Sequence, residues 1–177
     1  MLNPEEKQKI LSYTKALLKA HLTHGPEPRL ELDSGLMEQE RGIFVTLKIQ
    51  GCLRGCIGQI LGYQPLRESV REMTFAAALK DPRFPPLTLK ELELVNIHIS
   101  LLTVPSPIKS YKDIRLGTDG IIVTSGRKKG VYLPEVATET GWDQRTFFES
   151  CAMEKAGLTK HELSSAALEV FQTEGFE

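Results

Sequence analysis

The sequence predicts an α+β fold, because patterns typical of strands and of helices alternate loosely through both halves of the chain. Strands are indicated by apolar residues at every second position, and helices by capping residues or proline ahead of apolar stripes with helical spacing. The chain has 177 residues, of which 41% are hydrophobic and 25% are charged, so it can bury an ordinary core. We expect one domain, or two small lobes in close contact.

Local signals predict the first helix and the first strand. Asn3 and Pro4, followed by two glutamates, are typical of a helix start, and this helix should end before Gly25-Pro26 and cover a sheet. Residues 42–50 then alternate with a period of two, which predicts a strand. Its apolar residues face one way, and the residues between them face the other: Phe44, Thr46 and Lys48.

A second helix and a second strand are expected before the middle of the chain. The helix opens at Pro65 and should end near Lys80, because the following residue precedes a proline. Residues 88–92 combine a capping box with a hydrophobic staple, so a short helical turn should lead into a strand over residues 94–101. The less apolar face of that strand would carry three polar residues: Asn96, His98 and Ser100.

The second half of the sequence is more broken. A hairpin is expected from strands over residues 121–124 and 131–133, joined by a basic tip. Asp143 should cap a further helix that ends at Gly157, because glycine commonly follows the last turn of a helix. A last strand is expected over residues 168–171.

The glycine-rich segment 51–58, with the sequence GCLRGCIG, is the most informative stretch of the chain. Glycine in a strand loses packing and backbone entropy, so such a cluster indicates a bulge, a bend, or the close approach of a ligand or another backbone. In a straight strand Cys52, Arg54 and Cys56 would point to one face. A thiol and a guanidinium would then lie side by side over bare backbone.

Cys56 and Arg54 are the candidates for catalysis. The guanidinium of Arg54 can favour the reactive thiolate of Cys56, or grip a carboxylate or phosphate of a ligand. Gly55 and Gly58 are binding candidates, since a backbone without side chains lets a ligand approach. The alternatives are that Cys56 is a small buried hydrophobic residue, and that Arg54 forms a structural pair with an acid such as Asp81.

Three further residues are weaker binding candidates: Asp81, Arg83 and His98. Asp81 and Arg83 flank a proline in a rigid turn, and they either orient Arg54 and close a pocket or serve the architecture alone. His98 would supply the base of a Cys–His pair if the fold brought it to Cys56, whereas a hydrogen-bonded structural histidine is the commoner case.

No metal site and no cofactor is expected. In an extended segment the Cα atoms of Cys52 and Cys56 would lie roughly 13 Å apart, beyond the reach of a disulfide. Zinc or an iron–sulfur cluster would need more ligands at closer spacing. The third cysteine, Cys151, falls on an apolar helical stripe and is expected in the core. The sequence contains none of the phosphate-loop, dinucleotide-binding, zinc-protease or serine-hydrolase motifs.

Charge and hydropathy exclude several classes of partner. The formal net charge of -1 lacks the basic excess typical of nucleic-acid binders, so no nucleic-acid partner is expected. Residues 127–129 form one basic cluster, which fits a solvated hairpin tip better than a phosphate site. The first 20 residues resemble no secretory signal, and no apolar run is long enough to span a membrane. With three cysteines in no disulfide pattern, we expect a cytoplasmic protein.

Residues 53–58, LRGCIG, resemble the signature of the AMMECR-type domain family, whose prokaryotic members are called protein A of the AmmeMemoRadiSam system. Further segments agree with the family in order and spacing over nearly the whole chain: residues 76–87, which end in DPRFPPL, LPEV at 133–136, GWD at 141–143 and KAGL at 155–158. One position departs from the family pattern, because many prokaryotic members carry histidine where this chain has Asp119.

The resemblance implies a single AMMECR-type domain over residues 1–177, with a larger and a smaller lobe of strand and helix repeats around a shared, curved, barrel-like sheet. It also implies a pathway with a radical S-adenosylmethionine protein and a Memo-type protein, a relative of metal-dependent dioxygenases. It implies no established reaction, and the LRGCIG segment is the suspected functional site of the family.

Two functions of different classes follow as hypotheses. In the first, Cys56 reacts or Arg54 holds an anionic group in a pocket over the glycine-rich strand, so the protein handles a small anionic ligand or acts as an enzyme. In the second, the chain is a non-catalytic partner or scaffold module that docks on the radical S-adenosylmethionine or Memo-type protein. A nucleic-acid-binding regulator ranks third, because the net charge argues against it.

Overall fold

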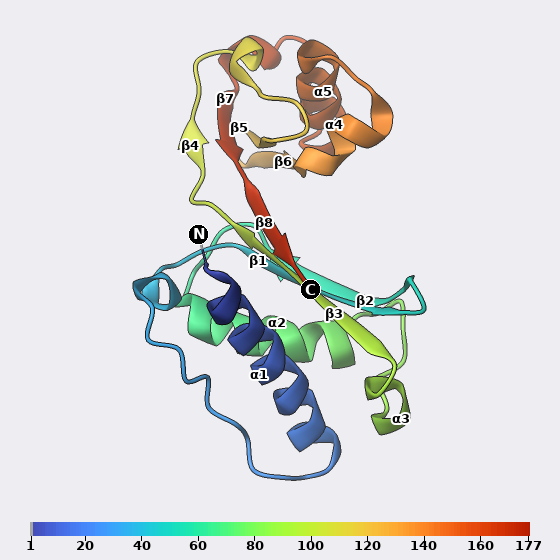
Figure 1. Ribbon diagram of the computed structural model, residues 1–177. Helices are drawn as coiled ribbons and strands as arrows, with labels where there is room; N and C mark the ends of the chain where they lie inside the picture. Colours follow the sequence, from blue (N-terminus) through green and yellow to red (C-terminus); the bar gives the residue numbers. More distant parts are fainter. Residues whose placement is uncertain (1) are drawn as a thin grey trace. The chain divides into compact units, whose positions relative to one another are not determined.

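The chain folds into two units, each with its own four-stranded antiparallel sheet and its own hydrophobic core (Figure 1). This computed structural model describes residues 2–177. The first unit contains the residues up to Leu102 together with Glu174–Glu177, and the second contains Thr103–Thr173. The mixed α and β composition predicted from the sequence is confirmed. Among the described residues, no helix combines the length and the apolar character needed to cross a membrane.

The first unit holds four strands and most of the long helices. In chain order its elements are α1 (Pro4–Leu22), η1 (Gly35–Glu38), β1 (Ile43–Ile49), β2 (Cys52–Gln59), α2 (Leu66–Leu79), α3 (Leu89–Leu92), β3 (Val95–Leu102) and β8 (Thr173–Phe176). The strand order in the sheet is β2-β1-β3-β8, so β2 forms one edge.

Local sequence signals set the ends of the two long helices. The side chain of Asn3 accepts a hydrogen bond from the N–H of Glu6, and the carboxylate of Glu6 accepts one from the N–H of Asn3. This reciprocal capping box satisfies two N–H groups that a first helical turn otherwise leaves unpaired. α1 ends at Leu22, as the sequence predicts, and α2 runs from just after Pro65 to Leu79.

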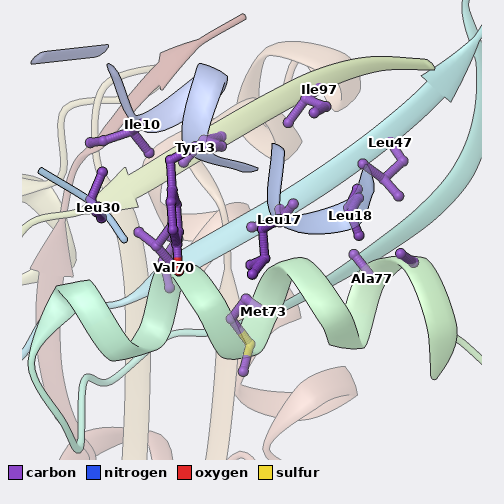
Figure 2. Packing of buried hydrophobic residues seen from close by; sticks show 14 of the residues in the cluster. Ile10, Tyr13, Leu17, Leu18, Leu30, Leu47, Val70, Met73, Ala77 and Ile97 are labelled. Carbon is purple, nitrogen blue, oxygen red and sulfur yellow. The ribbon is translucent and has the colours of Figure 1, made fainter. Parts of the chain in front are cut away.

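α1 and α2 cover the same face of the first sheet (Figure 1). Leu17 of α1, Val70 of α2 and Leu47 of β1 are fully buried in one hydrophobic cluster, which Figure 2 shows from close by. Burying a side chain of this size contributes about 1.5–3 kcal/mol relative to leaving it exposed. The helices are therefore held to the sheet mainly by apolar packing.

The strand alternation predicted for residues 42–50 is confirmed. The apolar residues of β1 that face α1 and α2 are fully buried: Ile43, Val45 and Leu47. The residues between them are partly exposed and point to the opposite side: Phe44, Thr46 and Lys48. We call this side, opposite α1 and α2, the outer face of the first sheet.

A tight turn joins β1 to β2. Gln50 and Gly51 both have positive φ, 50° and 79°, which is the backbone pattern of a type I′ hairpin turn. Glycine adopts this conformation without steric cost, which accounts for Gly51. The turn makes β2 return directly alongside β1, so the glycine-rich segment is placed at the edge of the sheet.

The second unit is built around the other sheet, with strand order β4-β7-β5-β6. Its elements are β4 (Ser106–Pro107), η2 (Tyr111–Asp113), β5 (Gly120–Ser125), β6 (Lys128–Tyr132), α4 (Pro134–Thr140), α5 (Gln144–Ser150), the π-helix η3 (Cys151–Lys155), η4 (Leu163–Ser165) and β7 (Ala167–Phe171). The predicted hairpin and the predicted last strand correspond to β5, β6 and β7.

The single helix expected from Asp143 to Gly157 is instead an α-helix that continues as one turn of π-helix. Asp143 caps α5 as predicted, but the N–H of Ala156 bonds to the carbonyl of Cys151, five residues earlier, at 3.1 Å. The wider turn packs against β6, where a Cβ on Gly130 would lie 2.7 Å from the same carbonyl oxygen. Only glycine fits at that contact.

A shared, curved, barrel-like sheet is not confirmed. The strands of residues 2–177 form two separate sheets, and neither sheet closes into a barrel. The reason is the pairing pattern: β1 joins β2 and β3 in one sheet, whereas β5 joins β6 and β7 in the other.

Candidate functional site

One extra residue in β2 determines which face of the sheet each side chain of the glycine-rich segment points to. In the antiparallel pair of β1 and β2, Gly55 lies opposite Leu47, whereas Leu53 lies opposite the next residue, Lys48. Arg54 is therefore the additional residue of a β-bulge. The two-residue alternation of a straight strand breaks at this point.

The expectation that Cys52, Arg54 and Cys56 share one face is wrong. Cys52 lies opposite Ile49, which packs partly against the core on the helix side. Cys56 lies opposite Thr46, which belongs to the outer face. The bulge between them rotates the strand, so the two thiols are on opposite faces of the sheet.

Cys56, Thr46 and His98 form a row across three neighbouring strands on the outer face. Thr46 of β1 is paired with Cys56 of β2 on one side and with His98 of β3 on the other. A hydrogen bond of 3.2 Å joins Thr46 Oγ1 and Cys56 Sγ. Because neighbouring strands lie about 4.8 Å apart, the backbones at Cys56 and His98 are roughly 10 Å apart. The His98 ring lies against Gly175 of β8, where a Cβ would be 3.0 Å from it, so the two side chains can meet only through a ligand that spans the row.

Two further rows flank this polar row. One contains Gly58, Phe44 and Ser100, and the other contains Leu53, Lys48 and Asn96. A Cβ on Gly58 would lie 2.4 Å from the ring of Phe44, so glycine here leaves room for the ring. The outer face thus offers an aromatic ring on one side of the row and an ammonium group on the other.

The guanidinium of Arg54 is held on the inner side of the bulge. Its Nε donates to Glu91 Oε1 at 2.8 Å, and its Nη2 donates to Glu91 Oε2 at 3.1 Å and to the carbonyl of Pro85 at 3.0 Å. The hydrogen bond from Arg54 lowers the pKa of Glu91 to about 2. Arg54 is buried and does pair with an acid, but this acid is Glu91 and not Asp81.

Asp81 and Arg83 clamp the free edge of β2 at Cys56. The N–H of Cys56 donates to Asp81 Oδ2 at 2.9 Å, and Arg83 Nη2 donates to the carbonyl of Cys56 at 3.1 Å. Arg83 also donates to Asp81 at 2.7 Å, which is the main reason that the pKa of Asp81 lies far below its usual range. The pair satisfies backbone groups that an edge strand otherwise leaves open.

The close approach at Gly55 is made by the protein's own backbone. A Cβ on Gly55 would lie 2.2 Å from the carbonyl oxygen of Ala77 in α2. Glycine therefore lets the helix pack directly onto the edge strand. This contact fixes the distance between α2 and the edge strand at Gly55, and so helps to position Cys56, the next residue.

Charged side chains of both signs lie around the row. The side chain of Arg83 is 53% exposed, and its pKa is raised mainly by the hydrogen bond to Asp81. Lys48 lies in the adjacent row, and His98 has Glu177 at 3.6 Å from its Nδ1. An anion that binds over Thr46 would therefore have Lys48 and the exposed guanidinium of Arg83 nearby, with Asp81 beside Arg83 and Glu177 beside His98 as the neighbouring acids.

The other two cysteines have different environments. Cys52 is exposed, whereas Cys151 is fully buried in the core of the second unit. Burial raises the pKa of the Cys151 thiol to about 12, so it is a poor nucleophile. In the part of the chain that the structure describes, no three histidine, cysteine or acidic side chains are grouped to hold a metal ion.

Asp119 has a structural environment within the second unit. Its carboxylate is buried and accepts hydrogen bonds from Arg115 at 2.7 Å and from Gln172 at 3.3 Å. Burial raises the pKa of Asp119, but these hydrogen bonds outweigh it and the net pKa is lowered. The carboxylate stays ionised and paired.

The sequence identifies Cys56 and His98 as candidate site residues, but it gives no functional role to Thr46, which lies between them, or to Lys48 in the adjacent row. Thr46 and Lys48 were assigned to the correct side of their strand by alternation alone, without a functional role. Glu91 was recognised only as a capping residue. Their importance depends on the pairing of β1 with both neighbours, and no local pattern encodes that register.

Comparison with known proteins gives a consistent result. A model of the AMMECR1 family matches residues 11–176. A protein of Methanothermobacter thermautotrophicus is 40% identical over 164 residues, which cover 89% of this chain and 85% of that relative. Protein MJ0810 of Methanocaldococcus jannaschii is 36% identical over 166 residues, which cover 89% of this chain and 82% of the relative.

A solved structure has the same fold. The crystal structure of the uncharacterized protein PH0010 from Pyrococcus horikoshii superposes with a TM-score of 0.79 at 29% sequence identity. The match covers 98% of this chain and 92% of that chain. The similarity thus extends through both units.

Proposed function

The chain belongs to the AMMECR1 family, and from its geometry we propose that it handles a small anionic ligand on the outer face of the first sheet, with Cys56 as the reactive group. The observation that carries this proposal is the row of Cys56, Thr46 and His98 across three strands. Every strand of the row is fixed by sheet pairing, so the side chains are presented by a rigid support.

The length of the row sets the size of the ligand. Cys56 and His98 stand roughly 10 Å apart across two strand spacings, with Thr46 between them. A metabolite of a few carbon atoms that lies over Thr46 would reach both ends. Phe44 would cover its apolar side, and Lys48 would face its charged side.

Cys56 is the group suited to chemistry, because a thiolate is a strong nucleophile and a nearby cation favours it. In this structure the nearby cation is Arg83, whose guanidinium bonds to the carbonyl of Cys56 itself. Arg54, the cation expected from the sequence, is buried and paired with Glu91, whereas Arg83 is paired with Asp81 but keeps half of its side chain exposed. We therefore propose Arg83 in the anion-binding role and Arg54 as the residue that holds the bulge.

Mass spectrometry of bound metabolites tests this proposal. Protein purified from its source under non-denaturing conditions should carry a small anionic metabolite. The amount should fall by about tenfold or more in Lys48→Gln and in His98→Gln, and it should be unchanged in His161→Gln, an exposed histidine of the second unit. Identical metabolite content in all four proteins would contradict a ligand site on this face.

The resemblance to the AmmeMemoRadiSam proteins adds the pathway to the proposal. We propose that the ligand is shared with a radical S-adenosylmethionine protein and a Memo-type protein. A genetic test is direct: loss of either of these proteins should change the metabolite that purifies with this chain. An unchanged metabolite in both deletion strains would remove the pathway link and leave the ligand site itself unaffected.

A partner or scaffold role is the second candidate, and exposed apolar side chains favour it. Leu53 is 41% exposed and Leu94 is 60% exposed. Both lie at the same end of the first sheet. Lys48 is paired with Leu53 on one side and with Asn96 on the other, and Leu94 comes two residues before Asn96. Exposed leucines that gather at one place are typical of docking surfaces.

Co-purification with the two proposed partners separates the candidates. A docking role predicts that Cys56→Ser keeps the complex, that Leu53→Ser with Leu94→Ser loses it, and that Leu61→Ser keeps it. Leu61 is a matched control, since it is 45% exposed and lies beyond the other end of β2. A complex that forms equally with all variants, or no complex at micromolar concentration, would rule out this surface.

A further inference from the structure

The second unit contains a cavity of about 490 Å³ that plays no part in the site on the first sheet. It is bordered by the segment that leads into η2, by one side of α5, and by residues 160–168. Cavities that hold small molecules commonly range from about 300 to 1,000 Å³. The space is therefore large enough for a ligand with one or two rings.

Two stacked aromatic rings form one wall of this cavity. The rings of Tyr111 and Phe148 are nearly parallel, at 11°, with centroids 5.9 Å apart. Phe148 is buried in the core of the second unit, whereas Tyr111 is partly exposed and lines the cavity. Ile108 and Leu168 extend the apolar wall. A flat, apolar wall of this kind suits the face of a planar ligand.

The charged residues of the cavity are mostly basic. Lys109, Arg145 and Lys160 line it, and Glu149 is its one acidic residue. Glu149 is paired with Arg145 at 2.7 Å. In the described part of the chain, neither Lys109 nor Lys160 forms a salt bridge. The cavity therefore has two uncompensated positive charges in a protein whose formal net charge is -1.

A cavity of similar size in the first unit shows that this excess is not a general property of the surface. That cavity, about 450 Å³ beside α1, is lined by two acids and two bases: Glu5, Glu31, Lys9 and Arg29. Its charges cancel, and Lys9 bonds to Glu5 at 2.9 Å. The cavity of the second unit differs from it by combining two stacked aromatic rings with two lysines that form no salt bridge among the described residues.

We propose that this cavity binds a small planar anion: an aromatic ring that carries a carboxylate or a phosphate. The ring lies against Tyr111, and the anionic group is held between Lys109 and Lys160, which approach from two different segments. Lysine ammonium groups form charge-assisted hydrogen bonds with either anion, and the hydroxyls of Ser110 and Ser164 line the same space. This site is independent of the one proposed at Cys56.

Fluorescence titration with three naphthalene probes tests the proposal on the intact protein. The probes are 1-naphthyl phosphate, 1-naphthoate and the neutral 1-naphthalenemethanol. At least one of the two anions should bind, and the neutral probe should bind at least about tenfold more weakly, because it lacks the charge that the lysines recognise. The anion that binds more tightly identifies the natural anionic group as a phosphate or a carboxylate.

Matched variants locate the binding. Lys109→Gln with Lys160→Gln should weaken the anion by about tenfold or more, and Tyr111→Leu should weaken it through loss of the ring contact. Arg127→Gln with Lys129→Gln removes the same charge from the exposed hairpin tip of the same unit and should leave affinity within about twofold. The four replaced lysine and arginine side chains are exposed and Tyr111 is partly exposed, so the fold should be kept. Equal weakening by both pairs, equal binding of the neutral probe, or no binding of either anion would overturn the proposal.

Discussion

At the scale of single residues, Arg54 and Cys56 are only two positions apart in the sequence, but their side chains have different surroundings. Its guanidinium turns inward to Glu91 and to the carbonyl of Pro85, while Cys56 faces outward to Thr46. An arginine buried beside carbonyl and carboxylate oxygens is well satisfied and is not free to hold a ligand. The signature LRGCIG thus combines a structural residue, Arg54, with an accessible one, Cys56.

The ion pair of Arg54 and Glu91 should give the protein a characteristic sensitivity to acid. The pKa of Glu91 is lowered from 4.5 to about 2, so folding favours the ionised carboxylate. Its contribution to stability is complete above about pH 4.5 and is lost as the pH falls through the folded pKa near 2. Glu91→Gln should lower the free energy of unfolding by about 1.5–3 kcal/mol at neutral pH.

Urea unfolding at several pH values measures this effect. The difference in unfolding free energy between wild type and Glu91→Gln should be largest above pH 4.5 and should shrink towards pH 2. Glu93→Gln is the control, since Glu93 is exposed and two residues away. A difference that stays constant across this pH range would contradict a role for the charge of Glu91. Glu91 would then act only through the hydrogen bonds that cap the helix at Thr88.

At the scale of elements, the contact of α2 with β2 depends on a missing side chain. Gly55 allows the carbonyl of Ala77 to approach within the space that a Cβ would occupy. The sheet edge at Cys56 is then closed by Asp81 and Arg83, which follow α2 directly. Helix, turn and strand therefore position Cys56 together.

Replacement of Gly55 by alanine should disrupt this arrangement. The new methyl group would meet a backbone oxygen at 2.2 Å, so α2 or β2 must move, and we expect a loss of about 3 kcal/mol or more in unfolding free energy. Gly35→Ala is the control, because no atom lies within 4 Å of the position of its Cβ. Thermal unfolding of the two variants compares them. A loss for Gly55→Ala no larger than that for Gly35→Ala would contradict the close packing of helix and strand.

The elements that the sequence predicts correctly are those with local causes. The helix start at Asn3, the capping box at Thr88 and the alternation of residues 42–50 depend on neighbours only a few positions away. The glycine cluster indicates a bulge as one of its alternatives but not its place at Arg54, and the sequence predicts neither the π-helix at Cys151 nor the separation of strands into two sheets. Each depends on a contact between distant segments, such as Gly130 with the π-helix, which no local pattern contains.

The candidate site follows the same division. Cys56 and its glycines could be singled out because glycine clusters in strands are rare for a physical reason. That His98 lies in the same row as Cys56 depends on the register of β1 with two neighbours. The sequence could name both residues but could not place them together.

At the scale of the whole molecule, the two units have separate hydrophobic cores, one around Leu47 and Val70 and the other around Phe147 and Val123. Residues that share a hydrophobic core tend to unfold together as one cooperative unit, whereas residues of different cores can unfold independently. The chain passes between the units twice, after Leu102 and after Thr173. Damage to one core should therefore be felt mainly in its own unit.

Hydrogen exchange measures this independence. In Gly55→Ala the backbone amides of β1 and β3 should exchange faster, because their unit has lost stability, while those of β5 and β7 should keep their wild-type rates. Gly35→Ala should change neither set. Equal acceleration in both sheets would show that the two cores unfold as one cooperative unit.

The alkylation rate of Cys56 by iodoacetamide tests the central claim most directly. In the Cys52→Ser protein, which removes the exposed competing thiol, quantitative mass spectrometry should find Cys56 modified at least about tenfold faster than the buried Cys151, and Arg83→Gln should slow the modification of Cys56. Equally slow modification of Cys56 and Cys151 in the folded protein would contradict an accessible, reactive thiol on the outer face.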